Sequence, residues 1–261
     1  GVSARLGIDA RTLHALKPEL IVLESAAYGS TGPKAEGAGF DMCFQALCGH
    51  DWRAGGVDNP PLWNRTSMVD FAAGLLGAIA VVQHLYQRAR TGAGAELGAG
   101  LMNAGLYLLS ELIQKPTGDF AGAPPVNHEQ TGFQPAEQFY EAADGWIAIA
   151  PRSEAMARSL VETLGLDRSV TKPRSTWRDD VAREIAAAVR KRPVAELLAA
   201  FAKADVWAEA CCPNGEREYL HDPDLERLGT VYRSLHPQFG DVRQIGPLCR
   251  LADSPPSARG R

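Results

Sequence analysis

Short apolar runs and longer apolar stretches alternate along the first hundred residues. Leu20 to Leu23 reads Leu-Ile-Val-Leu and precedes a glycine-containing turn, which predicts a fully buried strand of a parallel sheet. The stretch before it, Ala10 to Leu16, has the pattern of a helix. The turn Tyr28 to Pro33 follows the strand. Because ligands bind beyond the carboxyl ends of strands in open α/β sheets, this turn is a candidate ligand site.

A long apolar stretch, Thr66 to Arg90, predicts a helix. Asp70 falls in its first turn and Arg88 and Arg90 in its last, a charge order that suits the helix dipole. Its nearly uncharged part, Phe71 to Val82, has 12 residues. A bilayer span needs roughly 20. We therefore expect a helix inside the protein and no membrane as a partner.

Burial is expected for this helix and for the next one. The middle of the first is apolar on nearly every side, and Gly74 and Gly77 would let a neighbouring element approach closely. Leu101 to Leu112 has few charges and predicts a second, mostly buried helix. Both helices are expected to contribute to one core.

The pattern changes after a segment rich in proline and glycine. Lys115 to Gln134 predicts a linker or active-site loop. Asp144-Gly145 is a hairpin turn signal, and Trp146 to Ala150 is a predicted strand. Ser153 is a good helix N-cap. Helices are predicted from Ser153 to about Leu164, from Arg183 to Arg190 and from Val194 to Ala204. This part is predicted to be a small α+β unit.

Composition excludes several classes of protein. The 261 residues are 45% hydrophobic and 22% charged, close to the averages for globular proteins. The net charge is −4 with no basic stripe, so nucleic acid is not an expected partner. Five cysteines, an odd number with one adjacent pair, do not form a disulfide framework. The chain opens without a basic and apolar leader. We therefore expect a cytoplasmic protein.

Generic catalytic and metal-binding motifs are missing from the sequence. It contains no phosphate-binding loop with Gly-Lys-Ser/Thr, no Gly-x-Ser-x-Gly elbow and no His pair at zinc-protease spacing. Gly92-Ala93-Gly94 is too short for a dinucleotide fingerprint. Cys43, Cys48 and His50 lack the usual spacing and a second ligand pair, so no metal is expected.

Longer blocks in a fixed order carry a resemblance to a known family. They include Lys17 to Ile21, Ser25 to Pro33, Gly39 to Asp41 with Gln45, Asp70 with Gly74, Arg88 to Gly94, Asp144 to Ile147, Asp222-Pro223 and Asp253 to Pro255. In this order they resemble the class III coenzyme A transferases, such as formyl-CoA transferase and carnitine CoA-transferase, and the related α-methylacyl-CoA racemases. The resemblance covers essentially the whole chain.

The resemblance implies an α/β fold. It consists of an incomplete Rossmann-like CoA-transferase layer and a smaller α+β domain. We expect the remainder of the large CoA-binding domain in residues 1–134, the small domain in 135–215 and a segment returning toward the large domain in 216–261. The family's amino-terminal Rossmann portion is expected to precede Gly1. Relatives form interlocked dimers, so a homodimer or a hetero-oligomer with a homologous chain is expected.

The resemblance also implies a reaction. In the family an aspartate attacks an acyl-CoA thioester and passes CoA to a carboxylic acid, so CoA is a substrate and no cofactor is covalently bound. The matching position here is Asn103, whose amide cannot serve as a carboxylate nucleophile. Two hypotheses follow: a transferase, or a catalytically silent subunit that supports an active partner. Glu96 and Glu111 are the nearby carboxylates in the sequence, but both are interpreted as solvated charges.

A racemase or hydratase that uses Asp70 is a third alternative. The racemases have a histidine where Phe40 stands, which leaves Asp70 alone, and a carboxylate in a first turn is typically structural. For CoA or substrate binding, the resemblance points to Tyr28, Gly29 and Gln45. Two structural alternatives have equal weight: Tyr28 as an aromatic that covers the end of the strand, and Gln45 as a side chain that satisfies backbone groups.

Overall fold

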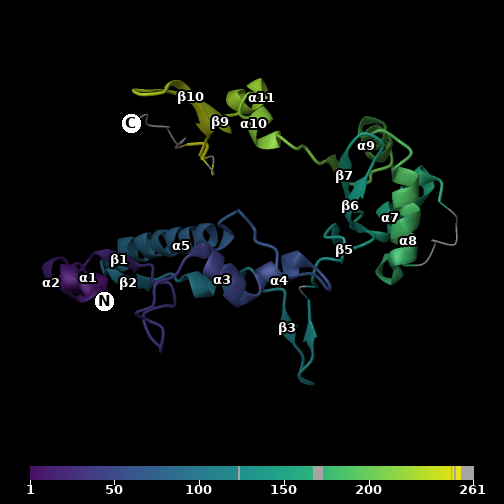
Figure 1. The fold of residues 1–261 in the computed structure, drawn as a ribbon. Helices are drawn as coiled ribbons and strands as arrows, with labels where there is room; N and C mark the ends of the chain where they lie inside the picture. Colours follow the sequence, from purple (N-terminus) through teal and green to yellow (C-terminus); the bar gives the residue numbers. More distant parts are fainter. Residues whose placement is uncertain (123, 167–172, 248, 250, 254–261) are drawn as a thin grey trace.

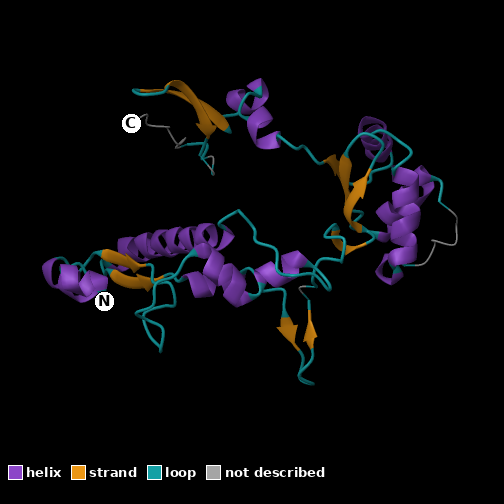
Figure 2. Ribbon diagram, viewed as in Figure 1, coloured by secondary structure: helices purple, strands orange, loops and turns teal. Residues whose placement is uncertain are grey.

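The computed structural model describes residues 1–122, 124–166, 173–247, 249 and 251–253. Figure 1 shows three successive parts: an N-terminal part built around a long helix, a sheet with helices beside it, and a C-terminal lobe beyond an extended segment. We call residues 1–122 the N-terminal part, 132–210 the small unit and 215–245 the C-terminal lobe. Helices and strands alternate in Figure 2, which confirms the mixed α/β class.

The N-terminal part contains one parallel strand pair. β1 (Ile21–Glu24) pairs with β2 (Ala95–Gly98) in the register Ile21↔Ala95. The predicted strand is therefore confirmed, but its expected full burial is wrong, because Leu23 is 37% exposed. The helices of this part are α1 (Val2–Leu6), α2 (Ala10–Leu16), α3 (Asp41–Cys48), α4 (His50–Gly55), α5 (Met68–Thr91) and α6 (Leu101–Tyr107).

The long helix α5 forms where the sequence predicts it, but its burial differs from the expectation. Val69, Ala73 and Gly77 are buried against β1, β2, α3 and α6. A Cβ atom on Gly77 would lie 3.0 Å from a methyl carbon of Leu23, so this glycine does allow close approach. Gly74 has nothing within 4 Å of such an atom, so the expected close approach there is wrong.

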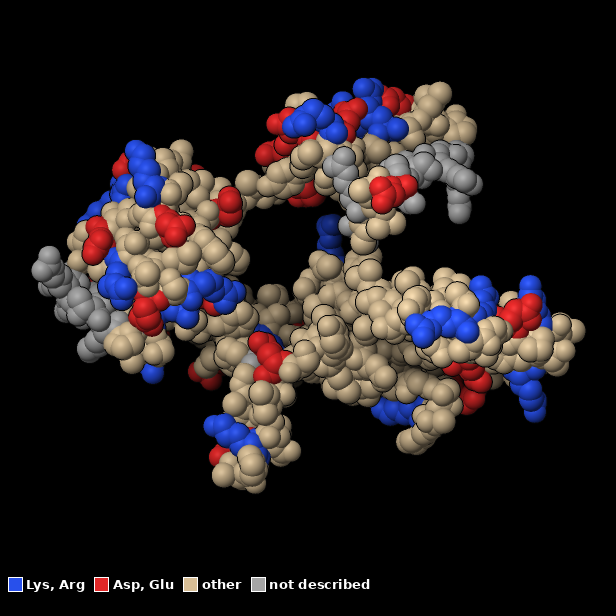
Figure 3. Space-filling model, turned by 180° about the vertical axis from the view of Figure 1, so that it is seen from behind, with Lys and Arg blue, Asp and Glu red and all other residues tan. Residues whose placement is uncertain are grey.

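The opposite face of α5 is exposed. Phe71, Leu75, Ile79, Val82 and Tyr86 are each more than half exposed. Their spacing places them on one face of the helix, and we call them the apolar stripe. In the view of Figure 3 the N-terminal part is mostly uncharged, whereas the small unit carries many charges of both signs. No described element covers the stripe, which is why the expected burial is wrong.

Length and composition give α5 a second property. Among the described residues it is the one helix that is long and apolar enough to cross a membrane, and 17% of its most apolar stretch is buried. The uncharged region continues past the Phe71–Val82 segment, because Gln83 to Gln87 carry no Asp, Glu, Lys or Arg. Packing against β1 and β2 on one side is typical of a helix that belongs to an α/β layer.

Two further expectations for this part need correction. α6 ends at Tyr107, earlier than predicted, and Leu106 and Tyr107 are more than half exposed. The segment Lys115 to Gln134 is not only a loop. Its first part completes a hairpin of β3 (Ile113–Gln114) and β4 (Phe120–Ala121) that projects from the body in Figure 1. Its last residues form β5 (Gly132–Gln134), which belongs to the small unit.

The small unit is a four-stranded antiparallel sheet with helices packed on it. The sheet order is β5, β6 (Glu137–Glu141), β7 (Trp146–Ile149) and β8 (Ala208–Ala210). The helices are α7 (Glu154–Leu164), α8 (Asp179–Val189) and α9 (Val194–Lys203), with the short 3-10 helix η2 (Arg174–Thr176). Its core contains Ile147, Leu160, Ile185 and Phe201, all fully buried.

Local signals in the small unit work as predicted. The Asp144-Gly145 turn joins β6 to β7, where the Ala142 amide donates to the Gly145 carbonyl at 2.7 Å. Ser153 caps α7 by accepting from the Met156 amide at 3.1 Å. The helix predicted from Arg183 starts four residues earlier, at Asp179.

The C-terminal lobe contains α10 (Gly215–Tyr219), α11 (Pro223–Arg227) and the hairpin of β9 (Val231–His236) and β10 (Gly240–Ile245). Asp222 caps α11 by accepting from the Asp224 amide at 2.8 Å. Across the hairpin, Arg233 pairs with Asp241, and this hydrogen bond lowers the pKa of Asp241.

Candidate functional site

A cleft lies at the carboxyl end of β1, where ligands bind in α/β layers. It has a volume of about 690 Å³. Its lining comes from α1, from the end of β1, from the turn that follows and from Leu101 at the start of α6. Gly29, a predicted site residue, is part of this lining. The cleft therefore lies beside the turn that the sequence pattern indicates as a candidate ligand site.

Tyr28 lies in the turn between Ala27 and Gly29, two residues that line the cleft, but is not part of the lining itself. Its ring lies 4.8 Å from the ring of Phe44 on α3, centroid to centroid, at an angle of 51°. The Lys34 ammonium lies 5.2 Å from the Tyr28 ring centroid, a cation–π distance. Tyr28 is half-buried by these contacts. The Tyr28 ring is thereby held by an aromatic contact and by a cation–π contact.

The turn after β1 docks directly on the start of α6. The Met102 amide donates to the Ala27 carbonyl at 3.0 Å. A Cβ atom on Gly100 would lie 2.9 Å from the Ala26 carbonyl oxygen, so the close approach needs glycine. Asn103 is the next residue after this contact and is exposed. The structure thus brings the turn of Tyr28 and the position of Asn103 together, although they are 75 residues apart in sequence.

Asp70 lies in the first turn of α5, with its side chain exposed. Asp41 on α3, and not Asp70, caps this helix. Its carboxylate Oδ2 accepts from the Val69 amide at 2.8 Å and from the Asp70 amide at 3.1 Å. Such bonds satisfy amides that have no partner within the helix. Asp41 therefore fixes the backbone that carries Asp70.

Gln45 is fully buried one turn after Asp41 and lies away from the cleft lining. Its Nε2 donates to the Asp41 carboxylate and to the Thr66 carbonyl at 3.1 Å. Its Oε1 has no hydrogen-bond partner among the described residues. In this arrangement Gln45 supports the cap of α5 and does not face the cleft.

Polar groups are also buried in α4. His50 Nε2 lies 2.9 Å from the Gly105 carbonyl, which ties α4 to α6. Asp51 is 7% exposed, and its Oδ1 has no partner among the described residues. Burial raises the pKa of Asp51, while the nearby His50 opposes this shift. Over the described ranges, no three His, Cys, Asp or Glu side chains gather as a metal site.

Carboxylates around the cleft include one that the sequence analysis missed. Glu24, the last residue of β1, lines the cleft, and its side chain accepts a hydrogen bond from the Ser3 hydroxyl. Its place at the carboxyl end of the predicted strand was the available signal. Glu111 lines a different cavity, beside the small unit. Phe40 is 75% exposed and has no group that could accept a proton.

One apolar cluster joins the elements that carry the site. Phe44, Val69, Ala73 and Ala104 are buried together, with Tyr28, Leu101 and Met102 packed against them. Asp70 follows Val69 and Asn103 precedes Ala104, so both predicted catalytic positions are neighbours of this cluster in sequence. The arrangement leaves a cleft beyond β1. Residue 103 presents an amide, which cannot act as a carboxylate nucleophile.

Comparisons with curated proteins give relatives with related activities. The succinyl-CoA–D-citramalate CoA-transferase of Chloroflexus aurantiacus is 26% identical over 98% of this chain and 65% of its own length. The acetyl-CoA:oxalate CoA-transferase of Acetobacter aceti is 26% identical over 79% of this chain and 55% of its own. Human alpha-methylacyl-CoA racemase is 28% identical over 63% and 44%. The chain thus spans about half to two thirds of the length of these relatives.

Solved structures share the fold. A CAIB/BAIF family protein from Brucella suis matches with a TM-score of 0.73 and 24% identity, over 98% of this chain and 67% of its own. Rv3272 from M. tuberculosis matches with a TM-score of 0.78 and 21% identity, over 98% and 69%. The family model described as CoA-transferase family III matches residues 1–261. The resemblance of the sequence blocks is therefore confirmed, and the chain belongs to CoA-transferase family III.

Proposed function

We propose that the protein binds an acyl-CoA thioester in the cleft beyond β1 and acts in the transfer of CoA to a carboxylic acid. The observation that carries this proposal is the family match over residues 1–261. Relatives named for citramalate, oxalate and glutarate support carboxylic acids as the class of acceptor. Acyl-CoA is then a substrate, and the five free thiols support action in the reducing cytoplasm.

Whether this chain can transfer CoA without a partner depends on the side chain at position 103. Nucleophilic transfer needs a carboxylate that attacks the thioester and becomes a mixed anhydride. The amide of Asn103 is uncharged and cannot form that anhydride. A second candidate function follows from this residue: a silent subunit that binds acyl-CoA and supports a homologous chain with the nucleophile.

Two observations support an association with a homologous chain. The apolar stripe of α5 is exposed over five side chains, and such patches mark interaction surfaces. One relative is named as the alpha subunit of a succinyl-CoA–L-malate CoA-transferase. We propose that the second chain covers the stripe. Ile79→Glu should then shift the protein to a smaller species in sedimentation, whereas an unchanged sedimentation coefficient would contradict this cover.

The experiment that tests the function is CoA exchange between an acyl-CoA and a labelled carboxylic acid. For a silent subunit we expect no turnover from the native chain or from Asn103→Ala, and turnover from Asn103→Asp. Asn214→Asp, on the segment before α10, is the matched control and should remain inactive. Turnover by the native chain that survives Asn103→Ala would exclude a role for Asn103 and support the transferase with another carboxylate.

Intact mass after incubation with acyl-CoA and borohydride separates the two candidates chemically. A CoA adduct mapped to a carboxylate of the native chain, such as Glu24, would overturn the silent-subunit hypothesis. Retention of CoA without a covalent adduct supports binding without transfer.

A further inference from the structure

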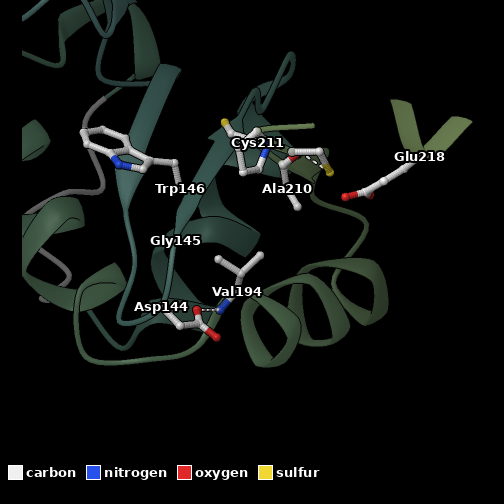
Figure 4. A pocket seen from close by; sticks show the side chains of 9 residues that line it. Asp144, Gly145, Trp146, Val194, Ala210, Cys211 and Glu218 are labelled. Carbon is white, nitrogen blue, oxygen red and sulfur yellow. Dashed lines mark hydrogen bonds between the residues drawn. The ribbon is translucent and has the colours of Figure 1, made fainter. Parts of the chain in front are cut away.

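Two cysteines are adjacent in the segment that leads from the small unit to the C-terminal lobe. Cys211 follows β8, and Cys212 comes next; both are exposed free thiols. They line a cavity of about 620 Å³ together with Trp146, Val194 and Glu218 (Figure 4). Cavities of roughly 300–1,000 Å³ hold small molecules. Both sulfurs are therefore accessible to a small thiol reagent.

A hydrogen bond fixes the backbone at Cys211, although neither cysteine belongs to a helix or a strand. The Cys211 amide donates to the Trp146 carbonyl at 2.9 Å and extends the pairing of β7 with β8 by one bond. The Cys212 thiol lies 3.7 Å from the Ala210 carbonyl oxygen and donates to it. Figure 4 shows the Cys211 sulfur turned away from the sulfur that makes this bond. The two thiols are adjacent along the chain, and no disulfide bond joins them in this structure.

We propose that Cys211 and Cys212 form a two-thiol modification site that exchanges with a small-molecule disulfide, such as oxidised glutathione, and closes to a disulfide between neighbouring residues. One thiolate attacks the small disulfide, forms a mixed disulfide and releases one glutathione. The second thiolate attacks the protein sulfur of that mixed disulfide and releases the other glutathione. The two protein thiols lose two electrons and two protons, and the small disulfide gains them.

Adjacency makes the second step intramolecular and the product readily reduced. The second thiol is tethered to the first, so its attack on the mixed disulfide needs no further encounter between molecules. Neighbouring Cα atoms across a trans peptide are ~3.8 Å apart, shorter than the ~4.4–6.8 Å of ordinary disulfides. The closed ring is therefore strained, and strained exposed disulfides are the readily reduced ones.

Closing the ring has a consequence for the C-terminal lobe. The eight-membered ring would include ψ of Cys211 and φ of Cys212, so closing it restricts both torsions to the values that the ring allows. Pro213 restricts ψ of Cys212 to extended values and does not prevent closure, because that torsion lies outside the ring. The thiol bond to Ala210 is lost. Because residues 211–214 connect β8 to α10, oxidation changes the direction in which the chain enters the lobe.

The test is intact-mass analysis of the full chain after incubation with excess oxidised glutathione, followed by peptide mapping. We expect the loss of two hydrogens within the peptide that contains Cys211 and Cys212, without retained glutathione, and reversal by a dithiol reductant. Partial desolvation at the cavity wall and the neighbouring Cys212 raise the pKa of the Cys211 thiol, so the reaction should accelerate as the pH increases.

Single substitutions give the matched controls. Cys211→Ser and Cys212→Ser should each retain glutathione on the remaining thiol, because no neighbour displaces it, whereas Cys249→Ser should behave as the native chain. Retained glutathione on the native pair, or a bridge from this pair to Cys43, would overturn the proposal. Amide exchange in α10 should change on oxidation, and unchanged exchange would overturn the altered entry into the lobe.

Discussion

The small unit and the N-terminal part differ in how completely they bury their own apolar side chains. Fourteen residues form the buried core of the small unit, among them Phe201 and Leu160. The corresponding cluster of the N-terminal part has four: Phe44, Val69, Ala73 and Ala104. Both counts refer to the part of the chain that the structure describes. Burial of apolar surface is the main stabilising contribution to folding, so the two regions should differ in stability.

The difference does not come from helix formation. α5 is the longest helix of the described residues, and its capping and charge order are favourable. What differs is the surface opposite each helix. α7, α8 and α9 lie around a four-stranded sheet, whereas α5 contacts a two-stranded pair and leaves its apolar stripe exposed. An amphipathic pattern therefore specifies a helix, but a second surface is required for its burial.

The largest expected effect comes from the core of the small unit. Phe201→Ala should lower the free energy of unfolding of this unit by about 3–5 kcal/mol, because it removes a fully buried ring and leaves a cavity. The measurement is a urea titration followed by tryptophan fluorescence in a variant that keeps Trp177, which is 4% exposed in the same core, and has Phe at the four other tryptophan positions.

Phe71→Ala is the matched control for this prediction. Its ring belongs to the apolar stripe and is 66% exposed, so in the dissociated chain obtained with Ile79→Glu the free energy of unfolding should change by no more than about 0.5 kcal/mol. An equal loss for the two variants in this background would show that the chain buries the stripe by itself, and the contrast between the regions would disappear.

A smaller effect is expected at the cap of α5. Asp41→Ala removes the acceptor for the Val69 and Asp70 amides and for Gln45. Since hydrogen bonds to charged groups contribute about 1.5–3 kcal/mol, we expect a loss near 2 kcal/mol, measured by thermal unfolding of the N-terminal part. Asp222→Ala removes the exposed cap of α11 and should cost only about 1 kcal/mol. A loss of 1 kcal/mol or less for Asp41→Ala would contradict its role as the main cap.

These two regions also mark what could be predicted from the sequence. The Asp144-Gly145 turn and the Ser153 cap depend on residues within four positions of each other, and both are confirmed. The burial of α5 depends on what lies opposite it, and composition does not contain that information. The prediction for α5 was therefore correct about helix formation, which depends on neighbouring residues, and wrong about burial, which depends on distant ones.

The candidate site divides in the same way. The turn at Tyr28 was located from the strand that precedes it, and the cleft lies there. The cap that Asp41 provides spans 28 residues to Val69. Of the two roles considered for Gln45, the structure shows the one at backbone carbonyls, within this cap network. Contacts between distant segments are created by folding and have no signature in the local pattern.

At Asp51 we expect a substitution that raises the free energy of unfolding, whereas the substitutions above lower it. Its carboxyl is buried, and burial raises its pKa in the folded state. Between the unfolded value, about 3.9, and the raised folded value, the folded state holds more protons, so stability falls as the pH increases through this window. Asp51→Asn should therefore stabilise the protein at neutral pH, by about 1 kcal/mol, the order of an unsatisfied buried polar group.

The pH dependence is the decisive part of this measurement. The stabilisation by Asp51→Asn should shrink as the pH falls below the unfolded value, because the native carboxyl is then protonated in both states. The exposed Asp119→Asn is the control and should give no comparable gain. A destabilised Asp51→Asn at neutral pH would mean that the ionised carboxylate has a partner in solution.

The smallest effect concerns the surface of the small unit. Arg192 and Glu196 form an ion pair with the Arg192 Nε atom 2.8 Å from the Glu196 Oε1 atom, one turn apart along the chain. Glu196 is 57% exposed, so Glu196→Gln should cost no more than about 0.5 kcal/mol, and less in high salt. Glu184→Gln, an exposed carboxylate on α8, is the matched control, and urea midpoints at two salt concentrations make the comparison. If Glu196→Gln destabilised the unit as much as Phe201→Ala, charge pairing and not the buried core would be the main source of the small unit's stability, and the difference between the two cores would no longer explain the comparison.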